Sequence, residues 1–83
     1  MEKSTFTREY KIMRYLLRKY RNEAGLTQVE VAAALDESQS YVSKCERGER
    51  RLDLVQVRAF CAAIKVDLLK FVAAFEAAVR RAK

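Results

Sequence analysis

Residues 28–48, QVEVAAALDESQSYVSKCERG, decide how this sequence folds. Apolar residues recur at helical spacing over residues 28–35 and again over 39–47, and the polar triplet Asp36-Glu37-Ser38 interrupts the pattern between them. Two helices this short are not stable on their own. We therefore expect a pair of short helices that is joined by a tight turn and supported by the rest of the chain.

Capping residues mark where these two helices begin and end. Thr27 precedes the first helix, and Glu30 follows three residues later, a pattern that forms a capping box. Ser38 is a good N-cap for the second helix, and Gly48 ends it. The positions expected to face the core are Val31, Ala32 and Leu35 in the first helix and Val42, Cys45 and Glu46 in the second.

Three longer helices are expected outside this pair. The first should run over about residues 7–24 and end at Gly25, which can take the left-handed conformation that closes a helix. Asp53 caps the next helix, and Asp67 caps a last helix over residues 68–81. Their apolar stripes are Met13, Leu16, Leu17, Tyr20 and Ala24; Val57, Phe60, Cys61 and Ile64; and Leu68, Phe71, Val72, Phe75 and Val79.

The composition agrees with a single all-α domain. The chain has 83 residues, of which 51% are hydrophobic, with no proline and only two glycines. This apolar fraction argues against disorder, and the scarcity of helix breakers allows nearly the whole chain to be helical. Because no repeat or linker divides the sequence, we predict one domain over residues 1–83.

The residue inventory excludes most kinds of chemistry. The chain has no histidine, and Cys45 and Cys61 form no Cys-x-x-Cys pair. A zinc ligand set, a serine–histidine triad and a cysteine–histidine nucleophile are thereby excluded, so we expect no enzyme, no metal and no cofactor. Both cysteines fall on apolar stripes, which predicts buried, reduced thiols and a cytoplasmic protein. We also expect no contact with a membrane and no signal peptide.

The charge favours a polyanionic partner. Seventeen Lys and Arg side chains against eleven Asp and Glu give a formal net charge of +6. An excess of this sign suits nucleic acid as the simplest partner. It equally suits a solvated surface that keeps the protein soluble by self-repulsion, and charge alone leaves the choice open.

Residues 28–48, together with SYVSKCERGERRLDL over residues 40–54, resemble the phage Cro and repressor family of XRE-type helix-turn-helix transcriptional regulators. The likeness extends over about residues 15–71. It implies a compact five-helix domain whose second short helix lies in the major groove of DNA while the first crosses the backbone. Asp36 departs from the usual turn glycine, and Glu37 departs from a common apolar residue. Aspartate tolerates the left-handed region, so the turn is expected to survive.

Gln28 and Gln39 each open one of the two short helices. The resemblance implies that Gln39 reads an adenine, and that Gln28 contacts phosphate and supports its neighbour. A glutamine amide can donate to adenine N7 and accept from N6 at once, which is worth about 1–3 kcal/mol of discrimination. Either residue alone would pass for an ordinary exposed polar side chain, but the spacing and the two caps favour DNA contact.

Other polar side chains complete the expected DNA interface. The residues expected to read bases beside Gln39 are Ser40, Ser43 and Lys44. The residues expected to contact the DNA backbone are Thr27, Gln28, Tyr41, Arg47, Arg50 and Arg51. Lys44 could reach a guanine or a phosphate, and Tyr41 could instead pack at the rim. The alternative for the three arginines is a solvated loop, and the residues expected only on the wet face of the first helix are Arg14, Arg18 and Lys19.

Arg21 and Glu46 match family positions that pair the first helix with the end of the second short helix. A bidentate pair there would hold that helix at a fixed angle. Such a pair is a weak argument for net stability and a better one for orientation.

These residues together predict a sequence-specific regulator that binds a double-stranded DNA operator and blocks or recruits RNA polymerase. Because one domain reads few base pairs, we expect a homodimer on an inverted repeat, with half-sites about 34 Å apart. The last helix is the natural interface, although it could instead complete the monomer's core. The residues expected in the interface are Leu68, Phe71, Val72, Phe75 and Val79.

Other functions remain compatible with this fold. A protein-interaction module, such as an anti-activator, would have lost DNA reading, yet the glutamines, Lys44 and the arginines look intact. An antitoxin would bind DNA and also hold a toxin. A restriction-modification controller or a mobile-element regulator fits equally well.

Overall fold

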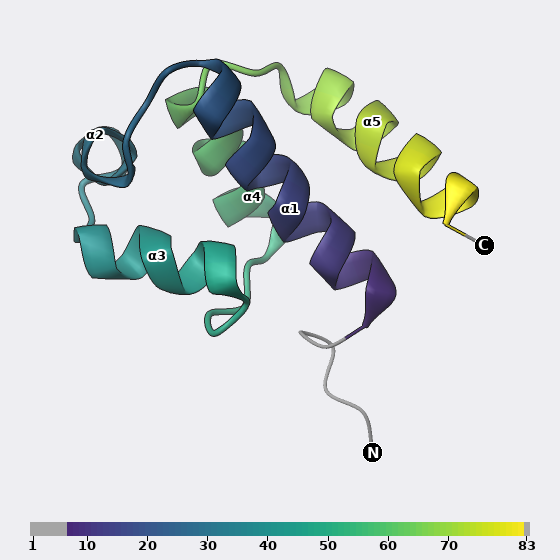
Figure 1. The fold of residues 1–83 in the computed structure, drawn as a ribbon. Helices are drawn as coiled ribbons and strands as arrows, with labels where there is room; N and C mark the ends of the chain where they lie inside the picture. The colour runs from purple at the N-terminus through teal and green to yellow at the C-terminus, as the bar shows by residue number, and fades with distance from the viewer. Residues whose placement is uncertain (1–6, 83) are drawn as a thin grey trace.

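The computed structural model describes residues 7–82, which fold into five α-helices without a β-strand (Figure 1). In chain order the helices are α1 (Arg8–Glu23), α2 (Gln28–Leu35), α3 (Gln39–Arg47), α4 (Leu54–Ala63) and α5 (Leu68–Arg81). The short helices α2 and α3 pack against each other, while α5 packs against α1 and α4 (Figure 1). The prediction of an all-α fold is confirmed.

Each helix begins at a polar side chain that accepts hydrogen bonds from N–H groups of its first turn. These caps are Thr7, Thr27, Ser38, Asp53 and Asp67. At α2 and α4 the capping box closes in both directions, through Glu30 and Gln56. The bounds of α1 differ from the expected 7–24, because Thr7 is its cap and Ala24 already follows its last residue.

Left-handed residues turn the chain at the ends of α2 and α3. Asp36 has φ 57° and ψ 43°, and the Glu37 N–H donates to the Ala32 carbonyl at 2.9 Å. The aspartate therefore takes the conformation that a glycine would adopt, as expected. Gly48, at φ 81°, ends α3, and a β-carbon there would lie 2.6 Å from Arg14 Nε. Any larger residue at this position would have to displace the Arg14 side chain.

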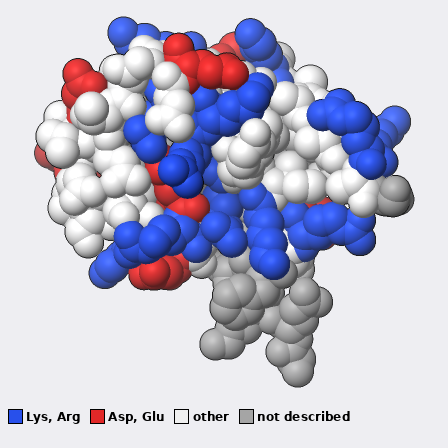
Figure 2. Space-filling view, viewed as in Figure 1, with Lys and Arg blue, Asp and Glu red and all other residues white. Residues whose placement is uncertain are grey.

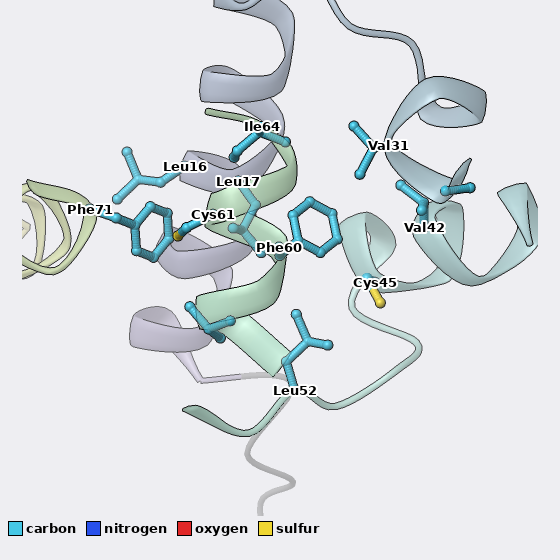
Figure 3. Packing of buried hydrophobic residues seen from close by; sticks show 12 residues of the cluster. Leu16, Leu17, Val31, Val42, Cys45, Leu52, Phe60, Cys61, Ile64 and Phe71 are labelled. Atoms are coloured by element: carbon cyan, nitrogen blue, oxygen red, sulfur yellow. The ribbon is translucent and has the colours of Figure 1, made fainter. Parts of the chain in front are cut away.

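The hydrophobic core lies where α1, α4 and α5 meet the α2–α3 pair. Figure 3 shows Leu17 and Phe60 at its centre, with Phe71 of α5 on one side and Val31 of α2 on the other. All four side chains are at most 2% exposed. Burial of each contributes roughly 1.5–3 kcal/mol relative to exposure. This shared core holds the two short helices, which their own length could not stabilise.

Both thiols lie in the core, as the sequence predicted. Cys45 is 0% exposed and Cys61 is 1% exposed, and both are free. Burial raises the pKa of the Cys45 thiol above its usual value. Burial, followed by the negative charge of Asp67, raises the pKa of Cys61 to about 11. Thiols in such surroundings stay protonated and unreactive near neutral pH.

The apolar stripe of α5 is divided between the core and the surface. Phe71 is 2% exposed, and its ring lies 6.1 Å from that of Tyr20 in α1, measured between ring centroids. Phe71 therefore has no surface left for a second subunit, which corrects the prediction that it lies in a dimer interface. Periodicity could not separate the two roles, because both require an apolar side chain on this face. The other residues of the predicted interface keep some exposed surface. Val72 is 43% exposed, and the half-buried ones are Leu68, Phe75 and Val79.

Candidate nucleic-acid interface

A buried ion pair fixes the end of α3 against α1. Arg21 donates from Nε and Nη2 to the two carboxylate oxygens of Glu46, over 2.5 and 3.0 Å. Arg21 also donates to the Leu26 carbonyl at 2.9 Å. The side chains of the pair are only 10% and 4% exposed, so the two charges satisfy each other away from water. The structure thus brings the two residues together in the bidentate geometry that the sequence analysis expected.

Two glutamines extend this ion pair to the surface. Gln28 Nε2 donates to Glu46 Oε1 at 3.0 Å, and Gln39 Nε2 donates to Gln28 Oε1 at 2.6 Å. The four side chains Arg21, Glu46, Gln28 and Gln39 form one hydrogen-bonded series, which we call the polar chain. At its outer end, the Gln39 carbonyl oxygen and one amide N–H make no hydrogen bond within residues 7–82. These are the acceptor and the donor that the edge of an adenine requires.

The other residues predicted to read bases differ in their exposure and in whether their side chains are already hydrogen-bonded. Ser40 and Lys44 are exposed on α3, as base reading requires. Ser43 is half-buried, and its hydroxyl accepts a hydrogen bond from Arg47 Nη1. Gln39, Ser40 and Lys44 are therefore the predicted base-reading residues that are exposed on α3. The Ser43 hydroxyl is already hydrogen-bonded to Arg47.

The arginines expected to contact phosphate have unlike surroundings. Arg47 donates two hydrogen bonds to Glu49, over 2.8 and 3.2 Å, and these bonds and its charge lower the pKa of that carboxyl. The Arg50 guanidinium lies 5.0 Å from the ring centre of the half-buried Tyr41, a cation–π contact. Arg51 is exposed and makes no salt bridge among the residues that the structure describes. Of the three arginines, Arg51 is consequently the one most available to bind a phosphate. Arg47 would first have to give up its hydrogen bonds to the Glu49 carboxylate.

The start of α2 is partly occupied by its own capping box. The Thr27 hydroxyl accepts from the Glu30 N–H at 3.1 Å, and the Glu30 carboxylate accepts from the Thr27 N–H at 2.8 Å. The N–H groups of Gln28 and Val29 are then the first-turn donors that the box does not use. They keep the partial positive charge of a helix start, which suits a phosphate.

Arg14 of α1 reaches this region, contrary to the sequence analysis. It was expected on the solvated face of α1, but it is half-buried, and its Nη1 donates to the Glu46 carbonyl at 3.3 Å. Its Nε is buried and has no hydrogen-bond partner among the described residues. The other two residues of that predicted face, Arg18 and Lys19, are exposed as expected.

Tyr10 of α1 also reaches this region, although no role was expected for it. Its hydroxyl accepts from the Leu52 N–H at 2.7 Å and donates to the Arg50 carbonyl at 3.3 Å. Tyr10, Arg14 and Arg21 recur on one stripe of α1, at spacings of four and seven residues. This spacing was the signal in the sequence that Tyr10 and Arg14 lie on the same side of α1 as Arg21, toward α3 and the loop that follows it.

The charge distribution supports a polyanion on this side of the molecule. Figure 2 shows Lys and Arg side chains in a band that crosses the face from the end of α3 over α1 toward the end of α5. Within residues 7–82, acidic and thiol side chains nowhere gather in a group of three that could hold a metal ion. None of the five helices described combines the length and apolar character that a membrane span requires.

Comparisons with known proteins identify the family. The sequence profile of a helix-turn-helix domain matches residues 13–70. An XRE-family like protein from Pseudomonas syringae pv. tomato str. DC3000 is 42% identical, with a TM-score of 0.80 over 83% of this chain and 84% of that one. The restriction-modification controller protein C.Esp1396I shares the fold at 20% identity, with a TM-score of 0.81 over 88% of this chain and 96% of that one. No curated protein sequence matches this chain. The chain belongs to the XRE-type helix-turn-helix family of DNA-binding transcription regulators, and it is not an enzyme.

Proposed function

We propose that this protein is a sequence-specific regulator that binds an inverted-repeat operator in double-stranded DNA as a homodimer. The observation that carries the proposal is the polar chain from Arg21 to Gln39. It begins at a buried ion pair and ends at an amide whose second N–H and carbonyl oxygen have no partner among residues 7–82. A reading group held in this way loses little conformational freedom on binding, which favours discrimination between bases.

The roles of individual residues follow from their surroundings. With α3 in the major groove, Gln39 reads an adenine, while Ser40 and Lys44 contact neighbouring bases. Ser43 contributes after it exchanges its bond with Arg47. The residues that contact the DNA backbone are Thr27, Gln28, Tyr41, Arg47, Arg50 and Arg51.

A homodimer would use the part of α5 that the monomer leaves open. Val72 is 43% exposed and Leu69 is 77% exposed, whereas Phe71 is already covered by α1. Leu68, Phe75 and Val79 are half-buried and would add their remaining surface. Two copies of this helix can pair across a two-fold axis, because such an interface joins the same patch on both subunits.

The regulator would act in the cytoplasm, as a repressor or a controller. Bound at an operator that overlaps a promoter, it would block RNA polymerase, and bound beside one it would recruit the enzyme. The abundance of the regulator would set the occupancy of the operator.

Selection of bound fragments from random duplex DNA, followed by footprinting of the enriched sequence, tests the proposal. The expected result is an inverted repeat with half-sites about 34 Å, one helical turn, apart. DNA flanking the protein's own gene should contain such a repeat. Enrichment of no common sequence, with binding as strong to random DNA as to the selected pool, would contradict sequence-specific regulation and favour the interaction-module alternative.

A further inference from the structure

The loop between α3 and α4, residues 48–53, carries Arg50 and Arg51, and one side chain from outside the loop holds the backbone on both sides of Arg51. In the described part of the chain, the backbone of residues 50–52 makes only two hydrogen bonds, and both go to the Tyr10 hydroxyl. That oxygen accepts from the Leu52 N–H at 2.7 Å and donates to the Arg50 carbonyl at 3.3 Å. The two contacted groups flank Arg51, so a single phenol spans the residue whose guanidinium is most available.

The two faces of this loop are fixed by different helices. Its backbone is attached to α1 through Tyr10, while the Arg50 side chain lies against the Tyr41 ring of α3. Leu52 is 8% exposed, so its N–H is in a place where a lost partner is not readily replaced by water. Without the hydroxyl, the backbone of residues 50–52 would keep no hydrogen bond to any residue from 7 to 82.

From this geometry we infer that Tyr10 is a positioning residue for DNA-backbone binding: its hydroxyl sets Arg50 and Arg51 in place before DNA arrives. The inference rests on the proposed function, because it assumes that these arginines contact phosphate. Fixing the backbone of a residue costs about 1–2 kcal/mol. A loop that is already fixed does not have to be ordered on binding. Without the hydroxyl, the loop would be ordered only when DNA binds, and the entropy cost of ordering it would then weaken binding.

Tyr10→Phe removes the hydroxyl and keeps the ring, and Tyr15→Phe on the same helix is the matched control. Tyr15 is 62% exposed, and its hydroxyl has no hydrogen bond within residues 7–82. Tyr10→Phe should bind the selected operator and random duplex DNA both about 5- to 30-fold more weakly, the factor for ordering one residue. Tyr15→Phe should bind like the parent. Circular dichroism at the binding temperature establishes that both variants are folded.

A double-mutant cycle separates positioning from a general loss of structure. In the Arg50→Ala, Arg51→Ala background, adding Tyr10→Phe should weaken binding by less than twofold, because the groups that it positions are gone. An equal loss in both backgrounds would show that Tyr10 supports the fold and not the arginines, which overturns the inference. Parental affinity of Tyr10→Phe would overturn it as well, while leaving the proposed function intact.

Amide exchange in the free protein tests the same contact without DNA. The Leu52 N–H should exchange at least tenfold faster in Tyr10→Phe than in the parent, and at the parental rate in Tyr15→Phe. An unchanged Leu52 rate would show that the hydroxyl does not hold the loop. If the parent itself binds no DNA, the proposed function fails, and the inference that rests on it fails too.

Discussion

Replacement of Glu46 by leucine tests whether the buried ion pair matters for stability or for orientation. The carboxylate accepts three hydrogen bonds, two from Arg21 at 2.5 and 3.0 Å and one from Gln28 at 3.0 Å. Glu46→Leu leaves the Arg21 guanidinium buried without its partner, which costs about 3–5 kcal/mol. The whole domain should be stable by about 4–12 kcal/mol, from 0.05–0.15 kcal/mol per residue over 83 residues. The single variant should therefore unfold at a much lower urea concentration, or be partly unfolded in buffer.

The double variant Arg21→Met, Glu46→Leu should give a different result. With both charges replaced by apolar side chains of similar volume, stability should return to within about 1 kcal/mol of the parent or exceed it. Operator affinity should nevertheless remain lower by about 1–3 kcal/mol, because Gln28 has lost the acceptor that orients it and Gln39. Binding to random DNA should change little.

Urea unfolding followed by circular dichroism gives the stabilities, and fluorescence anisotropy with labelled operator gives the affinities. The control is Glu23→Ala, which breaks the exposed Lys19–Glu23 pair (3.2 Å) and should change the free energy of unfolding by less than about 0.5 kcal/mol. A stable double variant with parental operator affinity would refute the orienting role. A stable single variant would refute the claim that the pair is buried from water.

Four further results are expected. Gln39→Ala should cost about 1–3 kcal/mol on the selected operator and almost nothing on random DNA, as measured by anisotropy; equal losses on both would make Gln39 a backbone contact. Arg51→Ala should lower the slope of log affinity against log salt by about 0.9, and an unchanged slope would show a solvated side chain. Val72→Asp should give a folded monomer in sedimentation and circular dichroism, and a persistent dimer would place the interface elsewhere. At pH 8 in native buffer, Cys45 and Cys61 should resist alkylation until the chain is unfolded, because burial raises the pKa of both thiols, that of Cys61 to about 11. Because these folded-state values lie above those of the unfolded chain, the contribution of the two thiols to stability should be constant below about pH 8.5 and fall above it; rapid native alkylation would contradict this burial.

Local patterns were sufficient to predict the helices. Each cap uses a side chain within a few residues of the groups that it satisfies, so Thr27 with Glu30 and Asp53 with Gln56 could be identified from spacing alone. Asp36 could be placed in a left-handed turn for the same reason. The pairing of Arg21 with Glu46 joins distant segments, and only the family resemblance pointed to it.

The remaining contacts depend on tertiary structure and were not predicted. Arg14 looked like one more basic residue on a solvated face, yet α3 and Gly48 cover it. Phe71 was expected in the dimer interface, yet Tyr20 of α1 packs against it within the monomer. In both cases one helix face had two candidate neighbours, and the periodicity identifies the face without identifying the neighbour.

Gln39, held at the end of the polar chain, is the side chain proposed to read an adenine. Replacement of each adenine of the selected half-site in turn by 7-deazaadenine removes the N7 acceptor and leaves the base pair intact. At one position the parent protein should bind roughly 2- to 12-fold more weakly, the value of one hydrogen bond, while Gln39→Ala should not respond there. If no adenine shows this difference between the two proteins, Gln39 does not read an adenine through N7.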